Sequence, residues 1–350
     1  MNQSRARVLS KSSLLNTLAQ YSKLNFMKAI VCEKYGPPSS LVYKDIEIGA
    51  PGPKEVQIDI KACSLNFPDT LIIQGKYQTK PELPFVPGSD ISGVVSAVGE
   101  GVKNLKVGDE VFGFTMTGGY AEKVNVSAKT IFPKPPMMDF PVAASFLLAY
   151  STSYHALKDR AYLKEGETIV VLGASGGVGL AAVEIAKCMG ARVIAAASTQ
   201  AKLDLCKSHG ADELINYNEE DLKSRIKELT GGKGADVVYD PVGGTYSEAA
   251  LRAMTYNGRF LVVGFAAGDI PKIPLNLPLL KSCQIVGVFW GTFAQQFPNQ
   301  NMANSMQLIQ WYATGKLKPH IHATYPLQDA PAALEEMMGR KVMGKVVVVC

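Results

Sequence analysis

The fold is decided by the stretch Ile169-Val170-Val171-Leu172-Gly173-Ala174-Ser175-Gly176-Gly177-Val178-Gly179-Leu180. Its apolar first part is typical of a buried strand, and residues 178–188 have helical spacing. Glycines between a strand and a helix allow a tight turn and let a pyrophosphate approach the helix N-terminus, where free N–H groups favour negative charge. We therefore predict a dinucleotide site at Gly173, Ala174, Ser175, Gly176, Gly177, Val178 and Gly179. The alternative is a glycine turn that only packs the strand against the helix.

The second predicted strand, residues 192–196, indicates which dinucleotide is bound. An NAD site usually has Asp or Glu about 20 residues past the turn, where it holds the ribose 2′-hydroxyl. This chain continues instead as Ala195-Ala196-Ala197-Ser198-Thr199-Gln200-Ala201-Lys202, with no carboxylate to repel a 2′-phosphate. Ser198, Lys202 and, after the next strand, Tyr217 can donate hydrogen bonds to that phosphate, so we predict NADPH. The alternative for Lys202 is an ordinary solvated helix residue.

Two kinds of pattern divide the chain. Strands and helices alternate from about residue 168, which predicts a doubly wound parallel sheet of α/β class. Residues 27–150 hold short β-like runs between Gly and Pro turns, and a mixed pattern after residue 290 ends in a strand over residues 345–349. We predict a β-rich domain of residues 27–150 and 291–350, interrupted by an α/β domain of residues 151–290.

Composition excludes several classes of protein. The chain has 350 residues, of which 47% are hydrophobic and 19% charged, as in ordinary globular proteins. No apolar run approaches the roughly 20 residues of a membrane span. The six cysteines form no Cys-x-x-Cys pair, and no His stands at metal-ligand spacing, so we predict reduced thiols in an intracellular protein and no metal site.

The N-terminus differs from the rest of the chain. Residues 1–26 contain serines and four basic residues but no Asp or Glu, a composition typical of a mitochondrial transit peptide. We therefore expect a leader at residues 1–26 and a location in the mitochondrial matrix; the alternative is a disordered tail on a cytoplasmic protein. Without this segment the chain is nearly neutral, which argues against nucleic acid as a main partner.

Several further motifs resemble the medium-chain dehydrogenase/reductase superfamily, and most closely its zinc-free quinone oxidoreductase (zeta-crystallin-like) branch. The resemblance covers nearly all of residues 27–350. Besides the glycine turn, it rests on Leu65-Asn66-Phe67-Pro68-Asp69-Thr70, Gln74-Gly75-Lys76-Tyr77, Val86-Pro87-Gly88-Ser89-Asp90, Val107-Gly108-Asp109, Gly210-Ala211-Asp212, Asp240-Pro241-Val242-Gly243-Gly244 and Gly344-Lys345-Val346. It implies a GroES-like catalytic domain for the β-rich part and a Rossmann domain for the α/β part, with the substrate between them.

The zinc-dependent alcohol dehydrogenases of that superfamily are the first alternative. They carry a cysteine where this chain has Asn66, and Gly-His-Glu where it has Gly88-Ser89-Asp90. A catalytic zinc takes about three N, S or O ligands from the protein, and the side chains of Asn66 and Ser89 are poor ligands. We therefore expect a reaction that does not use zinc.

The resemblance places Asn66, Asp69, Tyr77 and Thr152 around the nicotinamide. A phenol at Tyr77 can donate a proton after hydride adds to an enone; the alternative is a half-buried tyrosine beside a proline-rich loop. Asn66 is expected to orient cofactor or substrate, and a helix cap is an equal alternative for Asp69.

Late segments of the chain are also assigned to the cofactor. Gly264, Phe265, Phe289 and Trp290 follow predicted strands and are expected to approach the nicotinamide through their backbone groups. Aromatic core packing is the alternative for the three aromatic residues. The resemblance also assigns Lys345 to cofactor binding.

Three functions compete. The leading one is an NADPH-dependent reductase of quinones or other α,β-unsaturated carbonyl compounds. The second is a 2-enoyl thioester reductase, which the chain also resembles around Tyr77. The third is a non-catalytic NADPH-binding protein, because Leu71 stands where several quinone reductases carry a second tyrosine. We also expect a homodimer formed by strand pairing, because residues 286–289 are predicted to be an edge strand.

Overall fold

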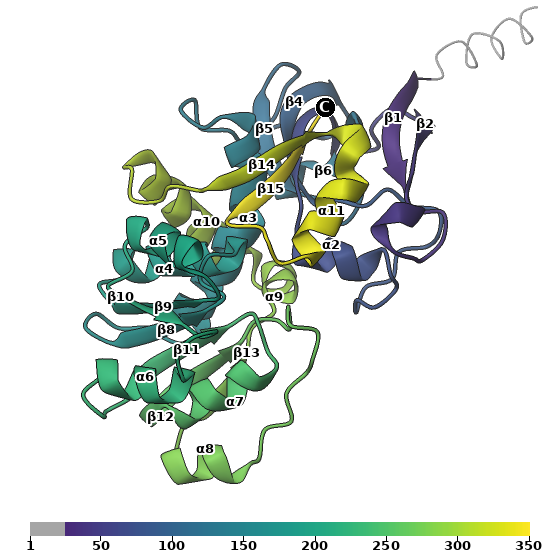
Figure 1. Ribbon diagram of the computed structural model, residues 1–350. Coiled ribbons are helices and arrows are strands. Elements are labelled where there is room, and N and C mark those ends of the chain that lie inside the picture. Colours follow the sequence, from purple (N-terminus) through teal and green to yellow (C-terminus); the bar gives the residue numbers. More distant parts are fainter. Residues whose placement is uncertain (1–24) are drawn as a thin grey trace, which may run out of the picture.

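The structure is a computed structural model that describes residues 25–350 (Figure 1). These residues form a two-stranded hairpin, a six-stranded sheet and a seven-stranded sheet. Most of the predicted leader, residues 1–24, lies outside the described part, so the leader and its mitochondrial destination stay predictions. Among the described helices, none is both long enough and apolar enough to cross a membrane.

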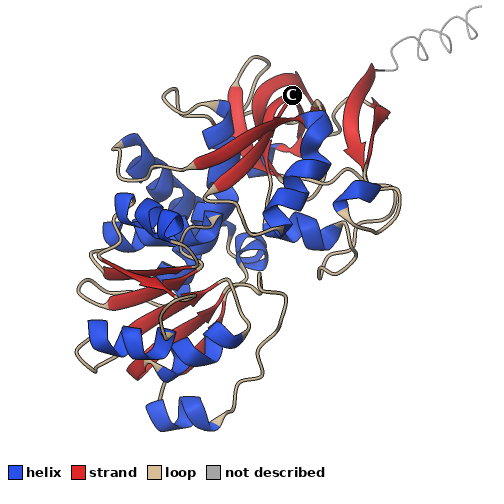
Figure 2. Ribbon diagram, viewed as in Figure 1, coloured by secondary structure: helices blue, strands red, loops and turns tan. Residues whose placement is uncertain are grey.

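The six-stranded sheet is parallel throughout, and its strand order is β10-β9-β8-β11-β12-β13. Its strands are β8 (Thr168–Leu172), β9 (Arg192–Ala197), β10 (Glu213–Asn216), β11 (Ala235–Asp240), β12 (Met254–Val262) and β13 (Gln284–Gly287). Its helices are α4 (Gly177–Cys188), α5 (Gln200–Ser208), α6 (Leu222–Leu229), α7 (Thr245–Arg252) and α8 (Asn276–Lys281). Figure 2 shows helices on both faces of this sheet. The predicted doubly wound α/β fold is therefore confirmed, and the strand order reverses at β8, where such folds bind ligands.

The seven-stranded sheet joins the two ends of the chain. Its order is β14-β15-β3-β4-β5-β7, and β6 pairs with β3. Its strands are β3 (Glu55–Ser64), β4 (Asp90–Val98), β5 (Glu110–Phe114), β6 (Lys123–Ser127), β7 (Ile131–Pro133), β14 (Ile321–Pro326) and β15 (Lys345–Val349). The hairpin of β1 (Asn25–Val31) and β2 (Val42–Ile48) lies beside it, and α2 (Phe67–Ile72) and α11 (Ala330–Met338) lie near it (Figure 1). This is the GroES-like part that the resemblance implies.

Helix α3 (Phe140–Tyr154), which continues as a π-helical turn over His155–Arg160, connects the two sheets. It contacts α4 as well as β3, β4, β5 and β15. Ser153 Oγ on α3 donates to the carbonyl of Val178 (2.8 Å) and lies 2.9 Å from the buried hydroxyl of Tyr239. The predicted domain limit at residue 150 falls inside this helix, and the domain bounds stay predictions.

The remaining helices, α9 (Trp290–Gln296) and α10 (Pro298–Ala313), follow the six-stranded sheet. α10 packs against α3. One apolar core cluster runs through both parts of the molecule, because it contains residues of β5, α3, β8, α4 and α10. The two sheets therefore share packing, which keeps the residues between them in fixed positions.

Asp69 is a buried residue in the first turn of α2. Its Oδ2 accepts hydrogen bonds from the backbone N–H of Asn66 (2.9 Å) and from the hydroxyl of Tyr120 (2.8 Å). The carboxyl therefore closes a helix cap, which is one of the two roles weighed from the sequence. Burial raises the pKa of Asp69 to about 6, although both hydrogen bonds act in the opposite direction.

We expect Asp69→Asn to change how stability depends on pH. The pKa of Asp69 is about 6 in the folded chain, against about 3.9 in an unfolded one. Between these values the folded state binds more protons, so this residue costs stability as pH rises, by about 3 kcal/mol in total. Asparagine keeps an oxygen acceptor but does not ionise.

The melting temperature of Asp69→Asn, relative to wild type, should therefore rise by a few degrees between about pH 4 and about pH 7.5. Thermal unfolding across this range measures it. Asp45→Asn, at a surface carboxylate paired with Lys28, is the control and should show a much smaller trend. A relative melting temperature that stays flat or falls with pH would contradict the prediction.

Candidate active site

The glycine turn, residues 173–179, lies between β8 and α4 at the point where the strand order reverses. Gly173 has a φ of +57°, and a Cβ atom on Gly179 would lie 2.3 Å from the Gly173 carbonyl oxygen. Side chains at these two positions are excluded by backbone conformation and by space. The turn thus leaves the N-terminal N–H groups of a 12-residue helix at the expected ligand position.

The residues predicted to select the dinucleotide lie together past the end of β9. Lys202 Nζ donates to Ser198 Oγ (3.2 Å), and the backbone N–H of Tyr217 donates to the carbonyl of Ala197 (3.1 Å). Burial raises the pKa of Tyr217 to about 12, so its hydroxyl stays protonated near neutral pH. The geometry supplies an ammonium and two hydroxyls at one place.

Arg340 completes this cluster and was missed by the sequence interpretation. Its carbonyl accepts from Lys202 Nζ (2.8 Å), and its guanidinium donates to the carbonyl of Ala267 (2.8 Å) on the other side. Its charge also acts on Tyr217. Within residues 25–350 neither Lys202 nor Arg340 is paired with a carboxylate, so two cations are available to an anion. Arg340 has a φ of +58°, which is uncommon outside glycine. No sequence pattern predicts that conformation.

The predicted catalytic residues come from three elements. Asn66 precedes α2, Tyr77 lies in the loop after α2, and Thr152 lies in α3; Asn66 is buried, and Tyr77 and Thr152 are half-buried. Burial raises the pKa of Tyr77, and the carboxylate of Asp69 raises it further. The electrostatic effect of Asp69 shows that the two side chains lie close enough to interact. The roles of these residues stay predictions.

Lys345 is more deeply buried than expected for a residue whose charge binds a cofactor. Only 6% of it is exposed. Its ammonium donates to the carbonyl of Leu65 (3.0 Å) and to Oδ1 of Asn66, inside the GroES-like part. A Cβ atom on Gly177 of the glycine turn would lie 2.7 Å from its Cδ. Its stem therefore contacts the turn while its charge faces away from it; its predicted contact with the cofactor stays a prediction.

The late residues occupy different environments. Gly264 and Phe265 follow β12, where the backbone N–H of Gly264 donates to the Asp240 carbonyl (3.3 Å). Phe289 is half exposed, whereas Trp290 is buried, packs edge-on against Phe114 (5.6 Å) and donates to Asn301 (2.8 Å). The side chain of Trp290 is thus part of the packing between the two sheets.

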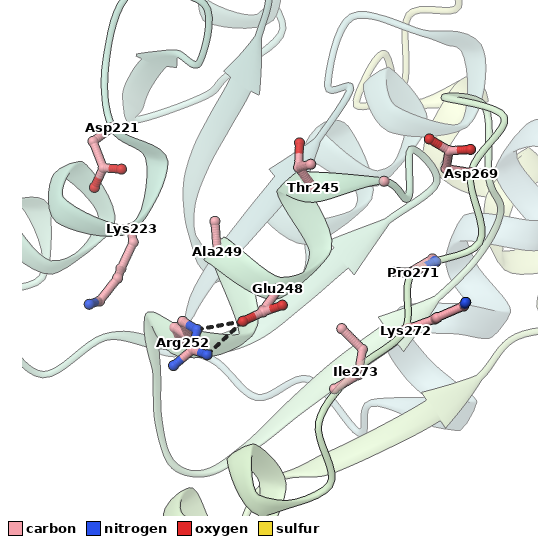
Figure 3. Close-up of a pocket in the computed structure, with 11 residues that line it drawn as sticks. Asp221, Lys223, Thr245, Glu248, Ala249, Arg252, Asp269, Pro271, Lys272 and Ile273 are labelled. Carbon is pink, nitrogen blue, oxygen red and sulfur yellow. Dashed lines mark hydrogen bonds and ion pairs between the residues drawn. The ribbon is translucent and has the colours of Figure 1, made fainter.

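A separate pocket of about 460 Å³ opens beside α7, between α6 and residues 269–273 (Figure 3). Its charged lining includes Arg252, which donates to Glu248 at 2.8 and 2.6 Å. None of the residues predicted for the active site lines it. It is therefore not part of the site built around the glycine turn.

The described side chains around the glycine turn and Asn66 do not form a metal-binding group. Within residues 25–350, no three His, Cys, Asp or Glu side chains are arranged to hold a metal ion. Ser89 and Asp90 are both buried at the start of β4, and Asn66 is occupied by Lys345.

Two domain families match the chain. Residues 52–136 match the alcohol dehydrogenase GroES-like domain, and residues 177–310 match the family described as zinc-binding dehydrogenase. Asn66 and Ser89, which the resemblance sets at positions where zinc alcohol dehydrogenases carry zinc ligands, lie within the first of these two matches.

Whole-length relatives and solved structures agree. Quinone oxidoreductase-like protein 2 of Bos taurus is 36% identical over 97% of this chain and 97% of its own length. A homolog of that protein from Nematostella vectensis is 38% identical over 92% of this chain and 88% of its own length. Escherichia coli quinone oxidoreductase, solved in complex with NADPH, has 32% identity and a TM-score of 0.87, covering 92% of this chain and 100% of that one. The chain is thus an oxidoreductase of the medium-chain dehydrogenase/reductase family and belongs to its quinone oxidoreductase branch.

Proposed function

We propose that the protein binds NADPH and reduces a quinone or another α,β-unsaturated carbonyl compound. The observation that carries the choice of cofactor is that Lys202 and Arg340 lie with Ser198 past the end of β9, where neither cation has a carboxylate partner among the described residues. A 2′-phosphate fits this donor set, and a pyrophosphate fits the glycine turn. Two solved relatives, from Escherichia coli and a mycobacterium, were determined in complex with NADPH, which supports the same choice.

Removing either cation should weaken the binding of NADPH more than the binding of NADH. We expect Arg340→Ala and Lys202→Ala each to raise the KM for NADPH by about tenfold or more, because each deletes a charge-assisted contact to the 2′-phosphate. The KM for NADH, which lacks that phosphate, should change by less than about twofold. Steady-state kinetics with both cofactors measure the two values.

The matched control is Lys207→Ala, on the same helix as Lys202, since its ammonium only donates to the Asp212 carbonyl (2.9 Å). Its cofactor preference should equal that of wild type. Equal losses with NADPH and NADH in the Arg340 and Lys202 variants would contradict the assignment.

In the proposed reaction the cofactor, NADPH, supplies the hydride when bound, and the protein supplies the proton and the hydrogen-bond donors. The phenol of Tyr77 donates the proton that the reduced substrate takes up, and its raised pKa keeps it protonated near neutral pH. The amide of Asn66, before α2, donates a hydrogen bond to the cofactor or substrate. The apolar packing shared by the two sheets keeps these groups in place and limits water.

Rates of NADPH consumption by wild type and Tyr77→Phe on several acceptors test which compound is reduced. Wild type should consume NADPH with a quinone or an enone, and the variant should lose at least about tenfold in kcat on the enone. Tyr43→Phe, in the exposed hairpin, is the control and should match wild type. A loss confined to an enoyl-CoA substrate would favour the enoyl thioester reductase instead. Tight NADPH binding without consumption on any acceptor would favour the non-catalytic alternative.

We also propose a homodimer formed at the free edge of the six-stranded sheet. β13 is the last strand of that sheet, and this strand and the segment before it expose apolar side chains that water solvates poorly. These side chains are Ile270, Leu275, Leu279, Leu280 and Ile285. Pairing of two β13 strands would cover them and satisfy the unpaired backbone groups of the edge.

Light scattering after size exclusion tests the dimer. Wild type should have twice the chain mass of 37.6 kDa, and Ile285→Lys with Leu279→Lys should shift it to a monomer, because two buried charges would oppose the interface. Val107→Lys, at an exposed apolar residue in the turn between β4 and β5, should leave the mass unchanged. A monomeric wild type would disprove this interface.

A further inference from the structure

Lys345 holds an unusual position at the junction of the two sheets. The backbone N–H of the preceding Gly344 donates to the carbonyl of Ser175 in the glycine turn (2.7 Å). Lys345 itself opens β15, and its side chain runs past Gly177 to Leu65 and Asn66. One residue thus reaches from the cofactor turn to the predicted catalytic asparagine.

The ammonium of Lys345 is surrounded by acidic groups. Asp90, Asp69 and the thiol of Cys63 all act electrostatically on it. Asp90 is completely buried, and neither of its carboxylate oxygens has a hydrogen-bond partner within residues 25–350. Burial raises the pKa of Asp90, and the ammonium of Lys345 opposes that shift. The ammonium of Lys345 therefore offsets part of the cost of burying a charge on Asp90.

The orientation of the Asn66 amide follows from this contact. An ammonium has hydrogen-bond donors only, so the atom of Asn66 that faces it must be the carbonyl oxygen. The NH₂ group then lies on the other side of the amide. Its one protein acceptor among the described residues is the Ser64 carbonyl, at a long 3.4 Å. At least one N–H of Asn66 therefore remains free to donate to a ligand.

A purely structural role explains this pair poorly. Taking two charges out of water costs several kcal/mol per ion, and apolar replacements of such pairs are often neutral or stabilising. The contact between the Lys345 ammonium and the Asn66 amide indicates that this pair has a role besides stability. The ammonium holds that amide in a single orientation before any ligand arrives.

We propose that Lys345 is the positioning residue of this active site: its ammonium, balanced by Asp90, fixes Asn66 with its oxygen inward and an N–H available to the reacting carbonyl or the cofactor. Lys345 does not touch the substrate in this arrangement and acts through Asn66. This inference rests on the reduction proposed above and adds the groups that prepare its hydrogen-bond donor.

The first test does not depend on turnover. Thermal unfolding is measured for wild type, Lys345→Met, Asp90→Asn and the double variant; methionine keeps the apolar stem against Gly177. Each single change leaves one buried charge without its partner and should lower the melting temperature by about 5 °C or more. The double variant removes both charges and should regain at least about half of the Lys345→Met loss. Additive losses would overturn the pairing.

The second test separates positioning from stability. The double variant should bind NADPH within about threefold of wild type, because the Lys345 ammonium faces Leu65 and Asn66 and methionine keeps the stem against Gly177, but it should lose at least about tenfold in kcat. A much larger loss of NADPH binding would mean that Lys345 holds the cofactor directly and would overturn the inference. Adding Asn66→Ala to the double variant should cost less than about twofold more, because the amide is already released. Recovery of both melting temperature and kcat in the double variant would mean a structural pair and would overturn the inference.

Lys134→Met is the matched control. Its ammonium is also buried and donates to the Met138 carbonyl (2.6 Å), but away from the glycine turn and Asn66. It should lower the melting temperature without lowering kcat; a loss of kcat equal to that of the Lys345 variants would count against the inference. If wild type consumes NADPH with none of the acceptors, the proposed function fails, and the unfolding cycle still decides whether Lys345 and Asp90 form a pair.

Discussion

The arrangement of this protein depends on one backbone contact between its two sheets, the hydrogen bond from Gly344 N–H to the Ser175 carbonyl. Gly344 has a φ of +75°, and a Cβ atom there would lie 2.3 Å from the His320 carbonyl oxygen. Only glycine fits this close approach. The contact joins the glycine turn of the six-stranded sheet to the residue just before β15, and so helps to fix the cofactor turn relative to the GroES-like part.

Residues 340–345 act on both ends of the site because of this contact. Arg340 lies with Lys202 where we place the 2′-phosphate, and Lys345 lies with Asn66 where we place the chemistry. The two residues use their charges differently. Within the part of the chain that the structure describes, Arg340 has no carboxylate partner and can bind an anion, whereas Lys345 is buried and already bonded to groups of the protein. Cofactor recognition and donor orientation thus come from one short segment.

Much of the six-stranded sheet could be predicted, because local patterns determine it. The predicted helix over residues 178–188 and strand over residues 192–196 match α4 and β9, and the glycine turn lies between β8 and α4 as expected. Pairing between distant segments could not be predicted in the same way. The sequence did not reveal β14, nor that Arg340 would join Lys202 across 138 residues. Lys345 was assigned to the cofactor, but its rotamer, which sends the charge to Asn66, depends on tertiary packing alone.

The position of β15 has a consequence for biosynthesis. Residues 345–349 lie in the interior of the seven-stranded sheet, between β14 and β3, and are synthesised after every strand of the six-stranded sheet. The six-stranded sheet is continuous in sequence from Thr168 to Gly287 and contains all its strands long before then. Since domains generally fold as units during synthesis, the middle of this chain can fold first. Strands β3 to β7 are made before the six-stranded sheet, but they complete their own sheet only after β15 has left the ribosome.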